Sequence, residues 1–218
     1  MKYAPAMVGL ILLTGCASVR HQPISSDAIG ALGSASTTTS AYDKPDFMAF
    51  TAGKAYFGVL GVLVAVSEGN KIIEENNVPD PAVRIGNSIA EYISLRRGVT
   101  ILPNATVANS DSLDSLSDLY QHARFIIDIK TLNWSFVYFS SDWNNYHVHY
   151  AARMRLIDTQ SKEIVAEDTC QFKPEYSNTD SAPTYDALVS TGAAGLKSEL
   201  FKAEEFCTDF FEKGALLL

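Results

Sequence analysis

Two histidines have the spacing of a metal site. His147 and His149 are two positions apart, so on a β-strand both rings project from the same face and can reach one ion. Zinc needs three or four ligands, and Asp142 is the only obvious third one nearby. The alternative is that both histidines are solvated residues on an exposed face. We favour it, and we predict no metal and no other cofactor.

Aromatic side chains crowd two adjoining predicted strands and the loop between them. Cross-strand aromatic pairs commonly stabilise a sheet, and this is the interpretation we favour. The alternative is a face that binds a partner or a ligand. Trp143 is its strongest member because it lies in a polar loop, where an aromatic ring and amides can hold a glycan or a protein. The candidate face consists of Trp143, Trp134, Tyr138 and Tyr146.

The carboxylates form no convincing pair for acid–base catalysis. Asp80 and Asp111 occupy positions typical of helix starts. Asp128 and Asp168 fall within predicted strands, where burial would raise their pKa values. The sequence has no Gly-x-Ser-x-Gly elbow, no phosphate-binding loop and no Cys-x-x-Cys pair. We therefore predict no catalytic residues and a protein that is not an enzyme.

Cys16 ends a segment that resembles the start of a bacterial lipoprotein. Lys2 provides a positive charge, and residues 6–13 form an apolar run that is too short to span a bilayer. The sequence Leu-Thr-Gly-Cys at 13–16 resembles the lipobox at all four positions. The resemblance implies cleavage after residue 15, lipid on Cys16 and a membrane-anchored chain. The alternative is an ordinary secretory signal that is cleaved and discarded.

The residues after Cys16 bear on which membrane holds the anchor. Ala17 and Ser18 follow it, and neither is the Asp that resembles an inner-membrane retention signal. This favours the outer membrane of a Gram-negative cell, with the chain on its periplasmic side.

Two further cysteines remain once Cys16 carries lipid. In an oxidising compartment Cys170 and Cys207 can persist as a disulfide, which would constrain the unfolded chain by about 4 kcal/mol. The alternative is two buried thiols that behave as small apolar groups. Sequence alone does not place the two Cα atoms, so both interpretations stay open.

Composition excludes some partners. The 218 residues are 47% hydrophobic and carry a net charge of −8. This apolar content is ordinary for a globular chain. No basic cluster is present to release counterions from a phosphate backbone, so nucleic acid is excluded as a partner. Attraction to anionic lipid by charge is excluded for the same reason.

We predict three regions along the chain. Residues 1–15 are a signal peptide. Residues 16–46 are the lipidated cysteine and a flexible tether, because Ser, Thr, Ala and Gly dominate there without apolar periodicity. Residues 47–218 form a single globular domain.

An apolar run over residues 55–66 is the least ordinary feature of that domain, because every residue in it is apolar or glycine. About twelve residues are too few to cross a bilayer. The interpretation we favour is a buried strand, or a core helix in which the glycines reduce steric crowding. The alternative is an interaction element, in which Gly58 and Gly61 let another helix or the bilayer approach closely.

The remaining elements follow from caps and periodicity. A helix begins after Asp80 with Pro81 in its first turn and ends at Gly98. A second helix is expected around Asp111, and a last long one begins after Thr184. The predicted strands are residues 99–102, 124–138, 146–156 and 163–172, of which 146–156 alternates most clearly between apolar and polar.

This order predicts an α/β (α+β) layer domain, a mostly antiparallel sheet with helices packed on it. The stretches Ala-Arg-Phe-Ile-Ile-Asp-Ile at 123–129 and Arg-Leu-Ile-Asp-Thr at 155–159 are similar to the amino-terminal domain of the Tol-system translocation protein and to the curli-secretion lipoprotein. That resemblance covers residues 80–205. It implies scaffolding or assembly at the envelope and transfers no catalytic residue.

The leading functional expectation is therefore a non-enzymatic structural or assembly subunit of an envelope complex, with protein partners or self-association. The second expectation is a periplasmic binding module for a glycan or a small ligand.

Overall fold

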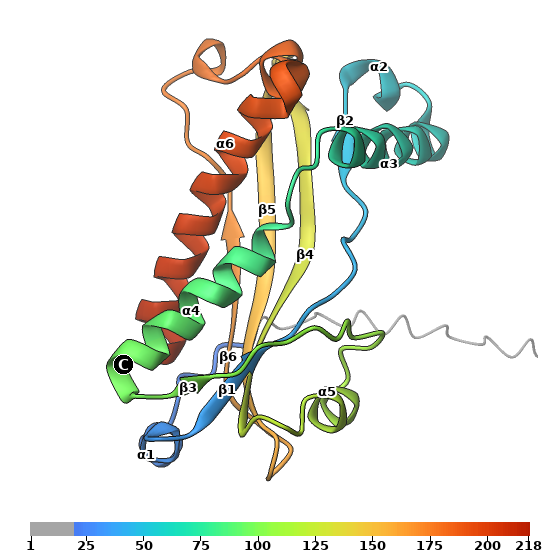
Figure 1. The fold of residues 1–218 in the computed structure, drawn as a ribbon. Coiled ribbons are helices and arrows are strands. Elements are labelled where there is room, and N and C mark those ends of the chain that lie inside the picture. The colour runs from blue at the N-terminus through green and yellow to red at the C-terminus, as the bar shows by residue number, and fades with distance from the viewer. Residues whose placement is uncertain (1–19) are drawn as a thin grey trace, which may run out of the picture.

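The computed structural model describes residues 20–218, so the predicted signal peptide and Cys16 lie outside the described residues. One twisted sheet has the strand order β3-β1-β4-β5-β6, and β2 pairs with the far half of β4 (Figure 1). The three long strands are antiparallel, whereas the three short ones pair in parallel. The strands are β1 Ser36–Thr39, β2 Met48–Phe50, β3 Thr100–Ile101, β4 Phe125–Phe139, β5 Asp142–Asp158 and β6 Glu163–Phe172.

Helices pack on this sheet, which confirms the predicted fold class. The long helices α4 and α6 lie across one face (Figure 1), and α5 packs on the other face. Among residues 20–218, no helix combines the length and the apolarity needed to cross a bilayer. The helices are α1 Ser26–Leu32, α2 Ala52–Ala55, α3 Gly58–Glu75, α4 Pro81–Arg97, α5 Leu113–Leu119, η1 Thr179–Ser181, α6 Tyr185–Phe211 and the π-helical turn η2 Glu212–Leu216.

A bulge in β4 keeps one face of this strand on the main core. Before the bulge the odd-numbered Phe125 and Ile127 are buried there, and after it the even-numbered Trp134 and Phe136 are. The register against β5 shifts between Thr131 and Asn133. A bulge adds one residue to one strand and so reverses the alternation that follows. The long hairpin of β4 and β5 therefore presents one continuous apolar face to α4 and α6.

The predicted helix boundaries at α4 are confirmed. Asp80 accepts a hydrogen bond from the amide of Ala82, and Gly98 ends the helix in the left-handed region. The helix expected around Asp111 is confirmed as α5, but its capping by Asp111 is wrong, because the hydroxyl of Ser112 caps this helix. The neighbouring Asp111 instead forms ion pairs with Lys130 and Arg153.

The prediction of a flexible tether is wrong for residues 26–39, which form α1 and β1. Strand β1 lies inside the sheet between β3 and β4. Thr37 and Thr38 are buried, and their hydroxyls donate to the carbonyls of Phe125 and Leu102. A run of Ser and Thr has no apolar pattern, but threonine is β-branched and suits a strand once its hydroxyl has a partner.

Candidate functional site

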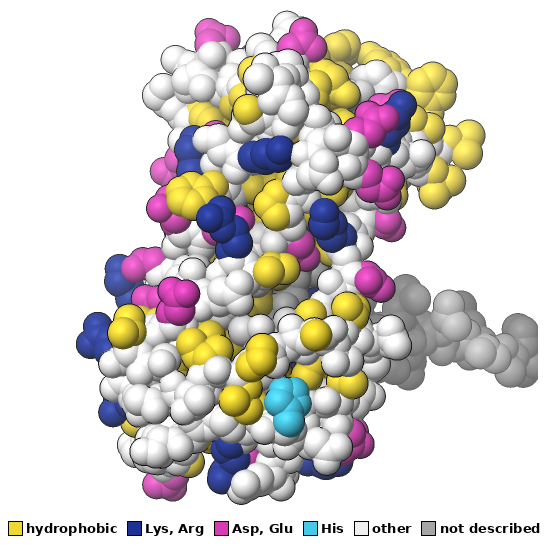
Figure 2. Space-filling view, viewed as in Figure 1, with side chains coloured by type: hydrophobic (Ala, Val, Ile, Leu, Met, Phe, Trp, Pro, Cys, Tyr) yellow, Lys and Arg dark blue, Asp and Glu magenta, His cyan; other side chains and the backbone are white. Residues whose placement is uncertain are grey.

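The apolar run over residues 55–66 forms the end of α2 and the first half of α3, and most of its side chains face outward. The expectation of burial is therefore wrong. We call the exposed side chains of residues 56–64 the apolar tip. Figure 2 shows them gathered where the α2–α3 hairpin projects from the molecule. Its members are between 42% and 78% exposed: Tyr56, Phe57, Val59, Leu60, Val62, Leu63 and Val64.

The glycines of α3 explain how this hairpin closes. A Cβ on Gly61 would lie 1.9 Å from the carbonyl oxygen of Lys54, and one on Gly69 would lie 2.0 Å from that of Phe47. Only a residue without Cβ permits such close approach of backbone to backbone. Both glycines thus bring α3 against this chain's own α2 and β2. The hypothesis that Gly61 admits a foreign helix is wrong for this position.

Lys54 fixes the base of the same hairpin. Its ammonium donates to the carbonyl of Ala49 at 2.7 Å and lies 2.6 Å from the carboxylate of Glu68. The Lys54 side chain is nearly buried. A buried charge is tolerated only when it is paired and hydrogen-bonded, as it is here. The pairing neutralises the only cation within residues 50–66 and leaves the tip apolar.

Trp143 lies beside the apolar tip. Its ring is 6.1 Å from that of Tyr56, edge to face, and the residue is 56% exposed. Two features that the sequence singled out separately, Trp143 and the apolar run, therefore form one surface. A groove of about 520 Å³ runs along the tip and is lined in part by Phe57, Leu60 and Val64.

The other members of the predicted aromatic face have different roles. Trp134 is buried, and its indole N–H donates to the carbonyls of Pro45 and Asp46. Tyr146 is also buried and packs edge to face on Phe136. Tyr138 is half-buried and stacks on Phe50, a residue of β2. These three aromatics stabilise the sheet, and only Trp143 is exposed enough to offer a ring to a partner.

The two histidines share a face, as expected, with ring centroids 4.3 Å apart. Burial, with help from His149 and Lys173, lowers the pKa of His147 to about 4. Burial also lowers the pKa of His149. Among residues 20–218, no group of three or more His, Cys, Asp or Glu side chains is arranged to hold a metal ion. The ring of His147 instead packs on Phe139, whose centroid lies 4.5 Å away, and on its other neighbour His149.

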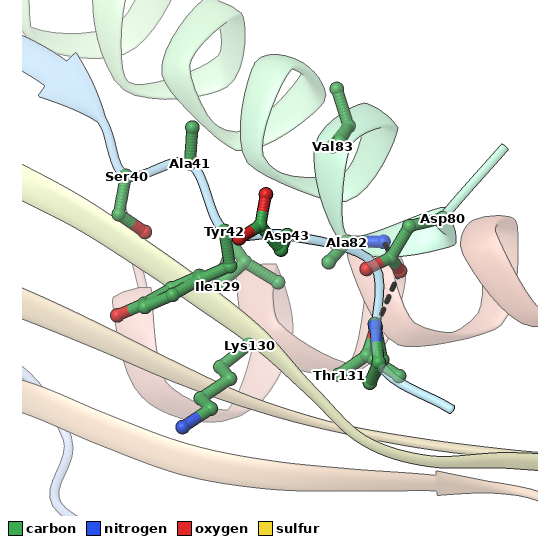
Figure 3. A pocket seen from close by; sticks show the side chains of 11 residues that line it. Ser40, Ala41, Tyr42, Asp43, Asp80, Ala82, Val83, Ile129, Lys130 and Thr131 are labelled. Carbon is green, nitrogen blue, oxygen red and sulfur yellow. Dashed lines mark hydrogen bonds between the residues drawn. The ribbon is translucent and has the colours of Figure 1, made fainter. Parts of the chain in front are cut away.

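The small cavity in Figure 3 lies between the start of α4 and β4. Its volume is about 40 Å³, which is room for a few water molecules at most. At one end the hydroxyl of Thr131 donates to Asp80 and lies 3.0 Å from the hydroxyl of Tyr150 (Figure 3 draws the first contact). Burial raises the pKa of the Asp80 carboxyl. Because Asp80 also caps α4, this cluster positions a helix and leaves no space for a substrate.

A second polar cluster is built around Asp128, which is fully buried in β4. It accepts hydrogen bonds from the hydroxyls of Ser40 and Tyr42 and from the guanidinium of Arg155. These contacts join the segment after β1 to the centre of the sheet. On the rim, hydrogen bonds from Lys130 and then from Arg153 lower the pKa of Asp111 to about 2. Every one of these carboxylates is held by a structural partner.

Cys170 on β6 and Cys207 on α6 form a disulfide, with 5.5 Å between their Cα atoms. From the sequence, a disulfide and two separate buried thiols were both possible interpretations of these cysteines. The bond ties the long helix to the edge of the sheet. The third cysteine, Cys16, lies outside the described residues, so its lipidation stays a prediction.

Neither a protein-family model nor a curated protein matches this sequence. Several solved structures resemble its fold loosely. Lipoprotein GNA1162 from Neisseria meningitidis is 10% identical, with 80% of this chain and 98% of that one covered and a TM-score of 0.33. The protein XCC0632 from Xanthomonas campestris is 12% identical, with 88% and 89% covered and a TM-score of 0.39.

A further similar structure is the PelC dodecamer from Paraburkholderia phytofirmans, which is 16% identical, with 84% of this chain and 96% of that one covered and a TM-score of 0.31. Values this low describe a distant likeness of fold, so we argue function from the residues of this chain. The resemblance to the Tol-system and curli-secretion proteins stays a prediction.

Proposed function

We propose that this protein is a non-enzymatic structural or assembly subunit of the bacterial envelope. In this proposal lipid on Cys16 holds it at the outer membrane, on the periplasmic side. The Leu-Thr-Gly-Cys sequence at 13–16 supports the anchor. The structural roles of Asp80, Asp128 and Asp111 support a scaffold, because each carboxylate stabilises an element of the fold.

The observation that carries the proposal is the apolar tip. Water-exposed apolar surface costs about 25 cal/mol per Å². Seven large apolar side chains gather on one projecting hairpin, and Trp143 of β5 lies beside them. Large contiguous apolar patches on soluble domains mark sites of interaction. We therefore assign the tip as the surface by which the anchored domain contacts other envelope components.

Gentle detergent extraction of the native lipidated protein tests this proposal. We expect a discrete assembly larger than one chain, with its components identified by mass spectrometry. Leu60→Asp together with Leu63→Asp places two charges on the exposed tip and is expected to reduce the yield of the assembly, because the tip then no longer docks the domain at the envelope. Leu95→Asp is the matched control, because Leu95 is 88% exposed on α4. A monomer that is the same size in all variants would contradict the proposal.

A second function is favoured by a separate groove beside Trp143. We propose as the alternative that this groove binds a glycan or a small ligand. Its volume is about 390 Å³, and rings, amides and hydroxyls of the kind that hold sugars line it: Trp143, Asn144, Tyr146, Thr184, Tyr185 and Asp186. A glycan that binds there should raise the melting temperature of the wild type and not that of Trp143→Ala. An equal shift in both proteins would dismiss the groove.

A further inference from the structure

The shape of the apolar tip restricts what can cover it. An α-helix turns about 100° per residue, so the exposed residues between Val59 and Val64 span roughly 200° of the circumference of α3. Only the side of Gly61 and Ala65 faces the protein. A flat protein surface can cover one side of such a convex projection. A fluid phase can surround all of it.

The length of chain before the first fixed residue restricts how far the domain can lie from the membrane. His21 contacts Asp168 at 2.8 Å, and both the amide and the carbonyl of Gln22 pair with Glu167. Cys16 is five residues before His21. Covalent geometry limits that span to about 18 Å. If Cys16 carries lipid, as the proposed function states, the domain is held against the bilayer, the nearest large apolar phase.

Charges and aromatic rings divide α3 into two halves. From Gly58 to Ala65 the helix has no charged residue over a rise of about 10 Å. Charged residues begin at Glu68 and continue with the Lys71–Glu75 pair. Tyr56 and Trp143 flank the uncharged half. Aromatic residues with one polar group are favoured at this level of a membrane.

A second copy of this chain fits the tip less well. Stable protein–protein interfaces bury about 1,200–2,000 Å² in total. Two convex projections that meet end to end share only part of their surface. The net charge of −8 on each copy adds repulsion.

From these observations we propose that the apolar tip inserts into the acyl layer of the membrane and gives the protein a second, non-covalent membrane contact. This inference rests on the proposed lipid anchor. Insertion is driven by apolar burial and not by charge, since Lys54 is paired internally. It therefore requires no anionic lipid and is insensitive to salt. With both contacts made, the domain is held in one orientation on the membrane surface.

The fluorescence of Trp143 tests the inference directly. The lipidated protein is reconstituted into phosphatidylcholine vesicles whose acyl chains carry bromine near the glycerol end, and into the same vesicles without bromine. Bromine quenches an indole that enters the acyl layer. We expect the emission of Trp143 to be lost in brominated vesicles, at low and at high salt. Trp134, which is 1% exposed, stays unquenched, so Trp143→Phe reports the background.

Two charged variants complete the experiment. Leu60→Asp with Leu63→Asp should abolish quenching while the protein still floats with the vesicles through Cys16, and Leu95→Asp should leave quenching intact. Equal Trp143 emission in both kinds of vesicle overturns the inference. If cross-links between the tips of two chains are found in the same sample, a second copy of this chain covers the tip instead of lipid. Wild type that floats without quenching refutes the inserted tip alone. Wild type that does not float refutes the lipid anchor as well.

Discussion

Lys54 illustrates how single side chains decide the character of the candidate site. Its ammonium lies in the middle of an apolar hairpin, yet contacts with Ala49 and Glu68 satisfy it. In the sequence this lysine looks like an interruption of the apolar run. In the fold it closes the hairpin and leaves the apolar side chains outside. Its internal partners depend on the tertiary fold and could not be predicted from residue spacing.

His147 gives the protein a stability that depends on pH. Its pKa is about 4 in the folded protein and near 6.5 when unfolded, so between these values the unfolded state binds the extra proton. The free energy of unfolding should therefore fall as pH falls from about 6.5 to 4. Partial exposure screens the effect, and we expect a loss of about 1–2 kcal/mol.

Urea unfolding of the wild type and of His147→Gln across this pH range measures the effect. Other groups titrate there too, so the difference between the two proteins is the quantity of interest. The wild type should lose more stability than His147→Gln as the pH is lowered. Parallel curves for the two proteins would show that His147 titrates normally in the folded state.

At the scale of elements, local signals predict boundaries well and burial less well. The cap at Asp80, the stop at Gly98 and the alternation of β5 gave elements that the structure confirms. These signals act within a few residues of the chain. Strand β1 was missed because its stability comes from contacts with Phe125 and Leu102, far away in sequence. The exposure of the apolar side of α3 was not predicted, because apolar composition indicates that a segment is buried but not which surface buries it.

Gly61 should be intolerant of any side chain. In Gly61→Ala the new Cβ meets the carbonyl oxygen of Lys54 at 1.9 Å, and a backbone atom cannot easily move. We expect the free energy of unfolding to fall by about 1–3 kcal/mol. Gly53→Ala in the adjoining α2 is the matched control, because nothing lies within 4 Å of its Cβ. It should be neutral or stabilise by up to about 1 kcal/mol. Urea midpoints measure both, and equal destabilisation would refute the close approach of α2 and α3.

The disulfide between β6 and α6 should be a major contributor to stability. It closes a loop with a sequence separation of 37 residues, which corresponds to about 4 kcal/mol in the chain-entropy model. Cys170→Ala with Cys207→Ala should lower the free energy of unfolding by roughly this amount. A thiol reductant should destabilise the wild type and leave the double variant unchanged. A reductant effect of equal size in both proteins would contradict this assignment.

At the scale of the whole molecule, the position of the first fixed residues shows that the tether is much shorter than composition predicts. A tether over residues 16–46 would let the domain lift away from the membrane. With α1 and β1 in the fold and His21 held by Asp168, at most about five residues separate the proposed lipid from the domain. In the proposed function the domain is therefore held against the membrane, which is the apolar phase that we propose for the projecting hairpin.

The measurement that tests this account most directly is the intact mass of the mature protein purified from its own membranes, combined with the membrane partition of Cys16→Ala. We predict a chain that begins at Cys16 and carries the mass of acyl groups on its thiol and its amino terminus. We also predict that Cys16→Ala stays uncleaved and unacylated. A mature chain with an unmodified thiol, or a Cys16→Ala variant that is cleaved and partitions like the wild type, would contradict the account.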